Sequence, residues 1–120
     1  MTIYTLKVTL LGSRPPVWRR IDVPADISLG QLHDVLQIAM GWTDSHLHQF
    51  ERGGVMYGPP DPEMEPRLNK QKTRLCDVLR KPKERMTYEY DFGDGWLHEI
   101  VAERVAKDES RTTARVLKAK

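Results

Sequence analysis

The beginning of the chain alternates between apolar and polar residues. Residues 4–10, YTLKVTL, place an apolar side chain at every second position, which is typical of a strand with one buried face. Residues 12–16, GSRPP, interrupt this pattern, and residues 17–23 resume it with Trp18 on the face opposite the aliphatic side chains. The short connection predicts an antiparallel hairpin of two strands.

The next segment follows a helical period instead. Its apolar residues recur three or four positions apart, which places them on one stripe of a helix; they are Leu29, Leu32, Leu36, Ala39 and Met40. Ser28 and Gln31 form a capping-box pattern in front of the helix, and Gly41 suits a left-handed cap at its end. A single apolar stripe predicts a helix that lies across one face of a sheet.

The remaining elements follow from shorter patterns and from breaker residues. We expect strands over 46–52 and 55–57 joined by a two-glycine turn, a loop over 58–66, a short helix over 74–80, and strands over 86–92 and 96–105. From residue 107 on the sequence is polar without clear periodicity, so this segment is expected to fray or to add one helical turn.

This order predicts an α+β fold with a mixed β-sheet and one main helix packed on one face, in a β-grasp-like arrangement. The order of the strands does not follow from the sequence. A length of 120 residues suits one domain, which we expect over 1–106, with 107–120 as a polar, basic C-terminal tail.

Composition indicates the cellular compartment in which the protein is expected. The single cysteine, Cys76, cannot form an internal disulfide and fits a reducing cytoplasm. No apolar run approaches the ~20 residues of a membrane helix, and the N-terminus lacks the pattern of a secretory signal. The expected location is therefore the cytoplasm, without membrane contact.

A net charge of +2 hides an uneven distribution of basic residues. Residues 67–85 contain eight basic residues and only two acidic residues. The nucleic-acid candidates among the basic residues are Lys70, Lys72, Arg74, Lys81 and Lys83. Such a run can neutralise phosphates. The alternative is an ordinary solvated surface, because few aromatic residues are available there for base stacking.

The densest group of polar and aromatic residues is YEYDFGDGWLHEI, residues 88–100. Aromatic residues alternate with acids before the turn at 93–95, and Asp91, Asp94 and His98 lie close together in sequence. His46 and His48, two positions apart on a strand, point the same way. Imidazoles with a carboxylate can bind a divalent cation, so one hypothesis is a metal site made of His46, His48, Asp91 and His98. The alternative is that these histidines hydrogen-bond to acids at the end of the sheet.

Tryptophan and arginine residues near strand ends suggest a second kind of site. Trp18, Trp42 and Trp96 are expected either to pack in the core or to line a groove for a peptide or a base. Arg19 and Arg20, beside Trp18, would flank such a groove.

Four segments of the chain resemble the plasmid pRiA4b ORF-3-like family, some members of which are labelled insertion-sequence passenger proteins. The segments are PPVWRRIDVP, LGQLHDVLQIAMGW, SHLHQFERGGVMYG and YEYDFGDGWLHEI, in this order. The resemblance implies a compact α+β domain and an association with plasmids or mobile elements, but no reaction and no residue roles. The positions that match the family's motifs are Trp18, Arg19, His33, Trp42, His46, His48, Phe50, Tyr57, Tyr90, Asp91, Gly93, Asp94, Gly95, Trp96 and His98.

The leading hypothesis is a non-enzymatic binding or interaction module with a protein partner in a plasmid-linked or mobile-element system. Its expected binding residues are Trp18, Arg19, His46, His48, Asp91, Asp94, Trp96 and His98. The alternatives are a metal-dependent enzyme, such as a hydrolase, that uses the clustered histidines and aspartates, and a nucleic-acid-binding protein that uses the basic segment 67–85. No cofactor other than a divalent metal is suggested, and the oligomeric state does not follow from the sequence.

Overall fold

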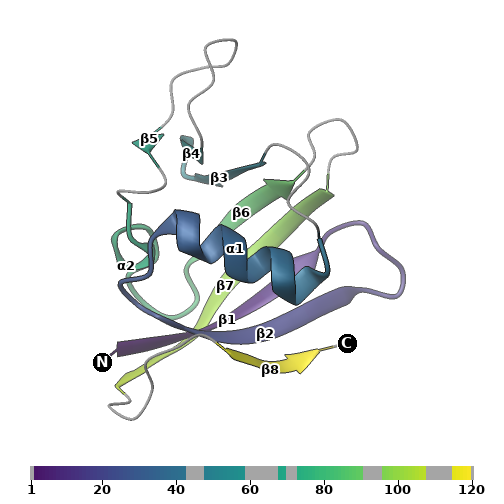
Figure 1. Cartoon of the computed structure of the whole chain (residues 1–120), viewed down its shortest axis with the longest axis horizontal. Coiled ribbons are helices and arrows are strands. Elements are labelled where there is room, and N and C mark those ends of the chain that lie inside the picture. The colour runs from purple at the N-terminus through teal and green to yellow at the C-terminus, as the bar shows by residue number, and fades with distance from the viewer. Residues whose placement is uncertain are drawn as a thin grey trace.

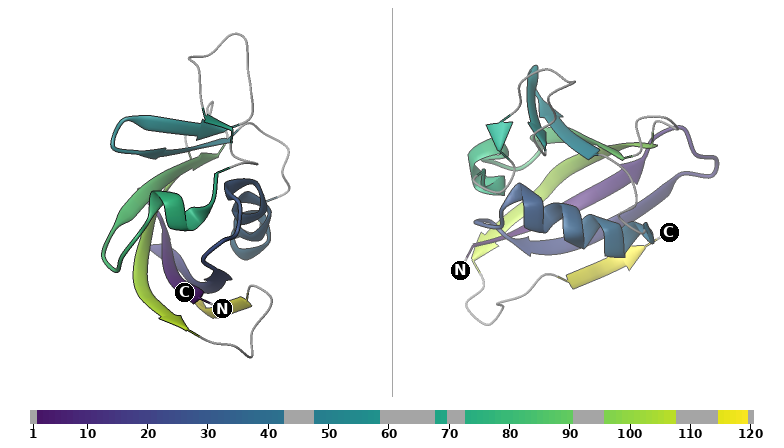
Figure 2. Two further views of the ribbon diagram at one scale, coloured as in Figure 1. Left: turned by 90° about the vertical axis from the view of Figure 1, so that its left-hand side faces the viewer. Right: turned by 45° about the horizontal axis from the view of Figure 1, so that its top comes forward.

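The computed structural model describes residues 2–42, 48–58, 68–69, 73–90, 96–107 and 115–119. In chain order the elements are β1 (Thr2–Leu10), β2 (Val17–Pro24), α1 (Leu29–Met40), β3 (His48–Arg52), β4 (Val55–Gly58), β5 (Leu68–Asn69), α2 (Leu75–Val78), β6 (Arg85–Tyr90), β7 (Trp96–Lys107) and β8 (Arg115–Ala119). Figure 1 shows α1 lying across one face of a single sheet, and the side view in Figure 2 shows the sheet curving around it.

The eight strands are ordered β5-β4-β3-β6-β7-β1-β2-β8. Only β4 and β5 pair in parallel, and the other neighbours are antiparallel. The predicted α+β class, a mixed sheet with one main helix on one face, is confirmed. Within the part of the chain described, neither helix is long and apolar enough to cross a membrane.

The core lies between α1 and the face of the sheet that it covers, which we call the inner face. Leu6, Val8 and Ile21 of β1 and β2 are fully buried, as are Leu32 and Leu36 of the helix. Burying a leucine or isoleucine side chain contributes about 1.5–3 kcal/mol, so this layer is the main source of stability. The opposite, outer face of the sheet is not covered by a helix (Figure 2).

The ends of α1 are those expected from the sequence. Ser28 Oγ accepts from the Gln31 backbone at 3.0 Å, and the Gln31 side chain accepts from the Ser28 backbone at 3.2 Å. Gly41 takes φ 76°, a left-handed conformation that glycine adopts without steric cost. The Arg19 side chain donates through Nε to the Ala39 carbonyl at 3.0 Å, which ties the end of the helix to β2.

Two secondary-structure expectations need correction. Arg115–Ala119, expected to be part of a tail, forms β8 and pairs antiparallel with β2. A polar edge strand gives little alternation, and its partner on β2 cannot be read from the sequence. The helix expected over 74–80 is a single turn, Leu75–Val78.

Candidate functional site

The hydroxyl of Tyr88 organises a buried polar cluster between α1 and the sheet. Tyr88 is fully buried on β6. Its hydroxyl accepts from Gln37 Nε2 at 2.8 Å and lies 2.7 Å from His33 Nδ1. His33 and Gln37 are one helical turn apart, so both reach the same point from α1. These bonds satisfy polar groups whose burial without a partner would cost about 1–3 kcal/mol each.

Two imidazole rings stack beside this cluster. The rings of His33 and His48 are nearly parallel, with centroids 3.5 Å apart and planes 8° from parallel. Both residues are buried, and His48 reaches the helix from β3. Two positive charges at this distance away from water would repel strongly, so this packing favours at least one neutral imidazole.

His98 closes the cluster on the side of β7. Its Nδ1 lies 3.1 Å from the Tyr88 carbonyl oxygen, and its Nε2 accepts from Trp42 Nε1 at 3.3 Å. This pattern requires a neutral ring that carries its proton on Nδ1. Burial lowers the pKa of His98, and hydrogen bonds to the backbone of Tyr88 and Trp96 offset part of that effect.

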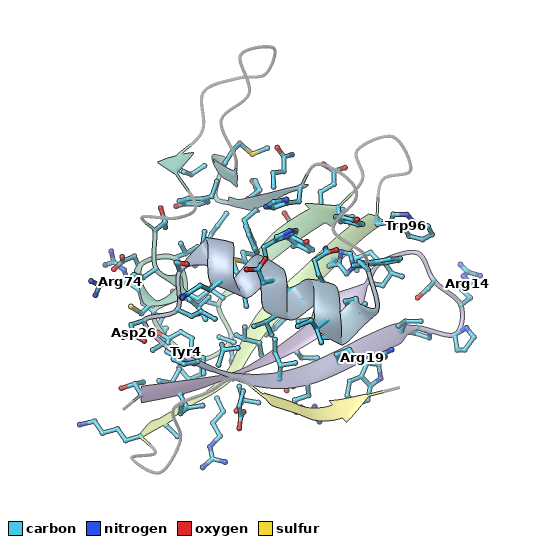
Figure 3. The ribbon with its side chains drawn as sticks, in the orientation of Figure 1. Tyr4, Arg14, Arg19, Asp26, Arg74 and Trp96 are labelled. Atoms are coloured by element: carbon cyan, nitrogen blue, oxygen red, sulfur yellow. The ribbon has the colours of Figure 1, made fainter. Side chains whose placement is uncertain are left out.

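Aromatic rings lead from His98 to the surface. The Trp42 indole stacks on Tyr90 with centroids 5.7 Å apart and packs against Trp96 at 5.4 Å. Trp96 is 39% exposed, and Figure 3 shows it at the end of the sheet, on the same side of the view as the β1–β2 connection that carries Arg14.

Two leucines extend this aromatic surface. The Leu11 backbone N–H donates to the Leu97 carbonyl at 2.8 Å, and both side chains are exposed, by 44% and 36%. We call Leu11, Trp96 and Leu97 the apolar corner. Trp96 and Leu97 are successive residues of β7 and therefore project from opposite faces of the sheet, Trp96 from the inner face and Leu97 from the outer face. The apolar corner thus wraps around the rim of the sheet at the start of β7, next to the buried polar cluster.

The structure brings together some of the residues predicted to form the site. The register places His48 opposite Tyr90, Tyr90 opposite Trp96, and Tyr88 opposite His98. His48, Trp96 and His98 therefore share the inner face at one end of the sheet. Because β6 lies between β3 and β7, His48 and His98 are on either side of Tyr88 instead of facing each other.

Trp18 does not belong to this group. It pairs with Thr9 on the outer face, where Lys7 Nζ and Arg20 Cζ lie 5.1 Å and 5.2 Å from the centre of its ring. Trp18 therefore faces away from His48 and His98, which lie on the inner face, because successive residues of a strand point to opposite faces. Arg19 is on the inner face, where its side chain donates a hydrogen bond to the last turn of α1.

The metal hypothesis rests partly on residues that the structure does not describe. His46, Asp91 and Asp94 lie outside the described residues. Within the described ranges no group of three His, Cys, Asp or Glu side chains is arranged to hold a metal ion. His98 uses both ring nitrogens in hydrogen bonds, so it would have to give up the Trp42 indole before it could bind a cation.

The basic candidates lie elsewhere. Arg74, Lys81 and Lys83 are exposed, and Figure 3 shows Arg74 at the end of the molecule opposite Trp96. Lys70 and Lys72 lie outside the described residues. Within the part of the chain that the structure describes, Arg74 of the basic segment is thus far from Trp96.

Sequence reasoning missed the roles of His33, Gln37 and Tyr88. A signal was present, because His33 and Gln37 are polar residues spaced by four that directly follow Leu32 and Leu36 of the apolar stripe. Such a pair indicates a buried hydrogen-bond partner on the facing sheet. Leu11 and Leu97 gave no signal, because their proximity depends on how β1 and β7 pair.

The comparisons with known proteins identify a family through one family model, and the names of the similar proteins describe no activity. The model of the family described as "Plasmid pRiA4b ORF-3-like protein" matches residues 2–120. "Uncharacterized protein y4hQ" of Sinorhizobium fredii (strain NBRC 101917 / NGR234) is 43% identical over 105 residues, which are 86% of this chain and 54% of that protein. The chain thus spans about half the length of this curated relative.

A solved structure shows the same fold. The crystal structure of "Protein of Unknown Function MM3350" from Methanosarcina mazei Go1 matches with a TM-score of 0.88 and 30% sequence identity. The match covers 98% of this chain and 69% of that chain.

Proposed function

Because the chain belongs to the plasmid pRiA4b ORF-3-like family, and the relatives named above carry no described activity, we propose a function from the geometry alone: a protein-binding module. The binding surface is the apolar corner, and the partner is a protein that covers it with apolar side chains. The plasmid in the family's description supports a role in a plasmid-linked or mobile-element system. The single cysteine supports a cytoplasmic setting.

The observation that carries this proposal is the exposure of Trp96 at the rim of the sheet, where Leu97 and Leu11 are exposed at the same strand end. Tryptophan is enriched among the residues that dominate protein–protein binding energy, and the centres of interfaces are poor in charge. Trp42, which is itself stacked on Tyr90, packs against the Trp96 ring, so a partner would meet a surface that is already ordered. Less side-chain entropy is then lost on binding.

The buried polar cluster supports binding better than a reaction. The Tyr88 hydroxyl bonds to both His33 Nδ1 and Gln37 Nε2, and His98 is held between an indole and a carbonyl. A general base or a metal ligand must reach its substrate or ion, whereas these groups are buried. We therefore assign them to holding α1 and Trp42 in place behind the apolar corner.

Site-specific photo-crosslinking in the organism that carries the protein tests the proposal. A photoreactive amino acid at position 97 should yield a discrete crosslinked protein that mass spectrometry identifies. The matched positions are Ile38 and Val55, which are also exposed apolar residues, by 80% and 41%, but lie on α1 and β4. They should yield no such adduct.

The identified partner then allows a quantitative test. Trp96→Ala should weaken binding of the purified partner by about 2 kcal/mol, roughly thirtyfold, as expected for a central interface tryptophan. Ile38→Ala should leave the affinity unchanged. Equal affinity of the Trp96→Ala and wild-type proteins, or equal crosslinking at all three positions, would contradict the proposal.

A further inference from the structure

A rigid turn presents basic side chains at the end of the molecule opposite the apolar corner. We call residues 80–83, RKPK, the basic turn; it follows α2 and leads into β6. The Lys83 N–H donates to the Ala102 carbonyl at 2.6 Å, and the Ala102 N–H donates to the Glu84 carbonyl at 2.9 Å. Pro82 limits the backbone further, so the turn is fixed on β7 and has little freedom to lose.

The acid next to this turn points inward. Glu84 Oε1 accepts from the Arg80 backbone N–H at 2.6 Å, and Oε2 lies 3.4 Å from Arg52 Nη2. The hydrogen bond from the Arg80 backbone lowers the pKa of Glu84, and burial opposes this effect in part. The charge of Arg52, together with the backbone hydrogen bond and the charge of Lys81, lowers the pKa further. The carboxylate therefore stabilises the turn and Arg52 together, while the side chains of Arg80, Lys81 and Lys83 are exposed.

The turn carries three exposed cations within four residues of the chain. On the sheet, ion pairs neutralise Arg20 with Glu103 at 2.6 Å and Arg85 with Glu99 at 3.3 Å. The side chains of Arg80, Lys81 and Lys83 form no ion pair with any residue that the structure describes. Their charge is therefore available to an anionic partner.

We propose that the basic turn binds the phosphodiester backbone of a nucleic acid. Lysine and arginine bind phosphates by releasing condensed counterions, which gives affinity without reading the base sequence. Base reading is not expected, because the nearest aromatic residues on this segment, Tyr88 and Tyr90, are buried and offer no stacking surface. The proposal is independent of the protein partner, since α2, which the turn follows, lies at the opposite side of the molecule from the start of β7 (Figure 1).

Fluorescence anisotropy with the purified full chain tests this proposal. The probes are labelled duplex DNA, single-stranded DNA and RNA of about 20 nucleotides per strand, titrated at about 50 mM and about 200 mM salt. The test variant is Lys81→Ala/Lys83→Ala. The control is Arg14→Ala/Lys107→Ala, which removes two exposed cations outside the turn and changes the net charge equally.

The test variant should lose about tenfold or more in affinity at low salt, and its log–log salt slope should fall by about 2, one for each phosphate contact removed. The control should stay within about twofold. The probe that binds most tightly identifies the kind of nucleic acid. Lys83→Gly, which removes the same charge and suits the left-handed backbone of this position, φ 76°, should reproduce part of the loss in a folded protein.

Two results would overturn the proposal. The first is no saturable binding of any probe by the wild-type chain at low salt. The second is an equal loss in the test and control variants, which would show a general effect of net charge and no contribution of the turn itself.

Discussion

Tyr88 shows how one side chain can unite elements that are far apart in sequence. Its hydroxyl contacts two residues of α1, its ring packs against Phe50 of β3 with centroids 4.9 Å apart, and its carbonyl lies 3.1 Å from His98 of β7. The ring of His98 packs against the ring of Tyr88, with centroids 5.3 Å apart.

The position of His98 predicts how stability depends on pH. Burial holds the pKa of His98 below its ordinary value of 6.5. As pH falls through the window between 6.5 and this lower pKa, the unfolded chain binds a proton that the folded chain does not. The free energy of unfolding should therefore fall, by at most about 1.4 kcal/mol per pH unit for one group.

Urea unfolding at about pH 7.5 and about pH 5.5 measures this effect. His98→Gln, which cannot titrate in this range, should show a smaller loss of stability between the two pH values. An identical pH dependence in the variant and the wild-type protein would show that His98 is not the linked group.

At the scale of elements, α1 is held at both ends by different means. Its start is capped within the helix itself, by Ser28 and Gln31. Its end depends on β2, because Arg19 donates to the Ala39 carbonyl. The positive charge of Arg19 also lies where the helix dipole favours a cation.

Arg19→Met should therefore destabilise the protein by about 1.5 kcal/mol, since it keeps the aliphatic packing but removes a charge-assisted hydrogen bond to the helix end. Arg20→Met is the matched control. Arg20 is the next residue of the same strand and lies on the outer face, where it pairs with Glu103. The loss of Arg20 should therefore matter much less. Thermal and urea unfolding of both variants measure the difference, and equal effects would argue against the role of Arg19 at the helix.

These elements show what could be predicted from the sequence. The helix and its caps depend on residues within one or two turns of each other, so Ser28, Gln31 and Gly41 were sufficient to place its ends. The Gly53-Gly54 turn is local in the same way, and both glycines take positive φ, 59° and 85°. The alternation in β1 and β2 correctly placed Trp18 on the face opposite the aliphatic residues.

Features that join distant segments could not be predicted. The stacking of His33 on His48 requires the register of β3 and the rotation of α1, neither of which leaves a local pattern. The same holds for Leu11 beside Leu97, and for β8 beside β2. The sequence therefore indicated the end of β6 and the start of β7 as the region of a candidate site. The division of this region into a buried polar cluster and an apolar corner depends on the tertiary structure.

At the scale of the whole molecule, the two proposed surfaces occupy opposite ends of one rigid sheet. The central strands β7 and β1 connect them, since β7 begins at the apolar corner and passes the basic turn at Ala102. A protein partner and a nucleic acid could therefore be bound at the same time without contact between them. This arrangement is suited to joining two macromolecules.

The position of β8 at the edge of the sheet predicts a further outcome. Ending the chain after Lys107 would remove β8 and expose the hydrogen-bonding edge of β2. Exposed edges pair with other chains, so this truncated protein should be less stable and should self-associate, as measured by thermal unfolding and light scattering. Removing Lys120 alone, which leaves β8 in place, should have neither effect. A monomeric truncated protein with unchanged thermal stability would show that β8 contributes little.

The place of β1 in the strand order also affects how the protein is made. β1 can pair with β2 as soon as the ribosome has released the first two dozen residues or so, but its other neighbour, β7, is among the last strands to be synthesised. Until then the nascent chain carries an open strand edge at what will become the middle of the sheet. The interval before β7 leaves the ribosome is therefore the stage at which wrong pairing with another nascent chain is easiest, and at which a chaperone would be most useful.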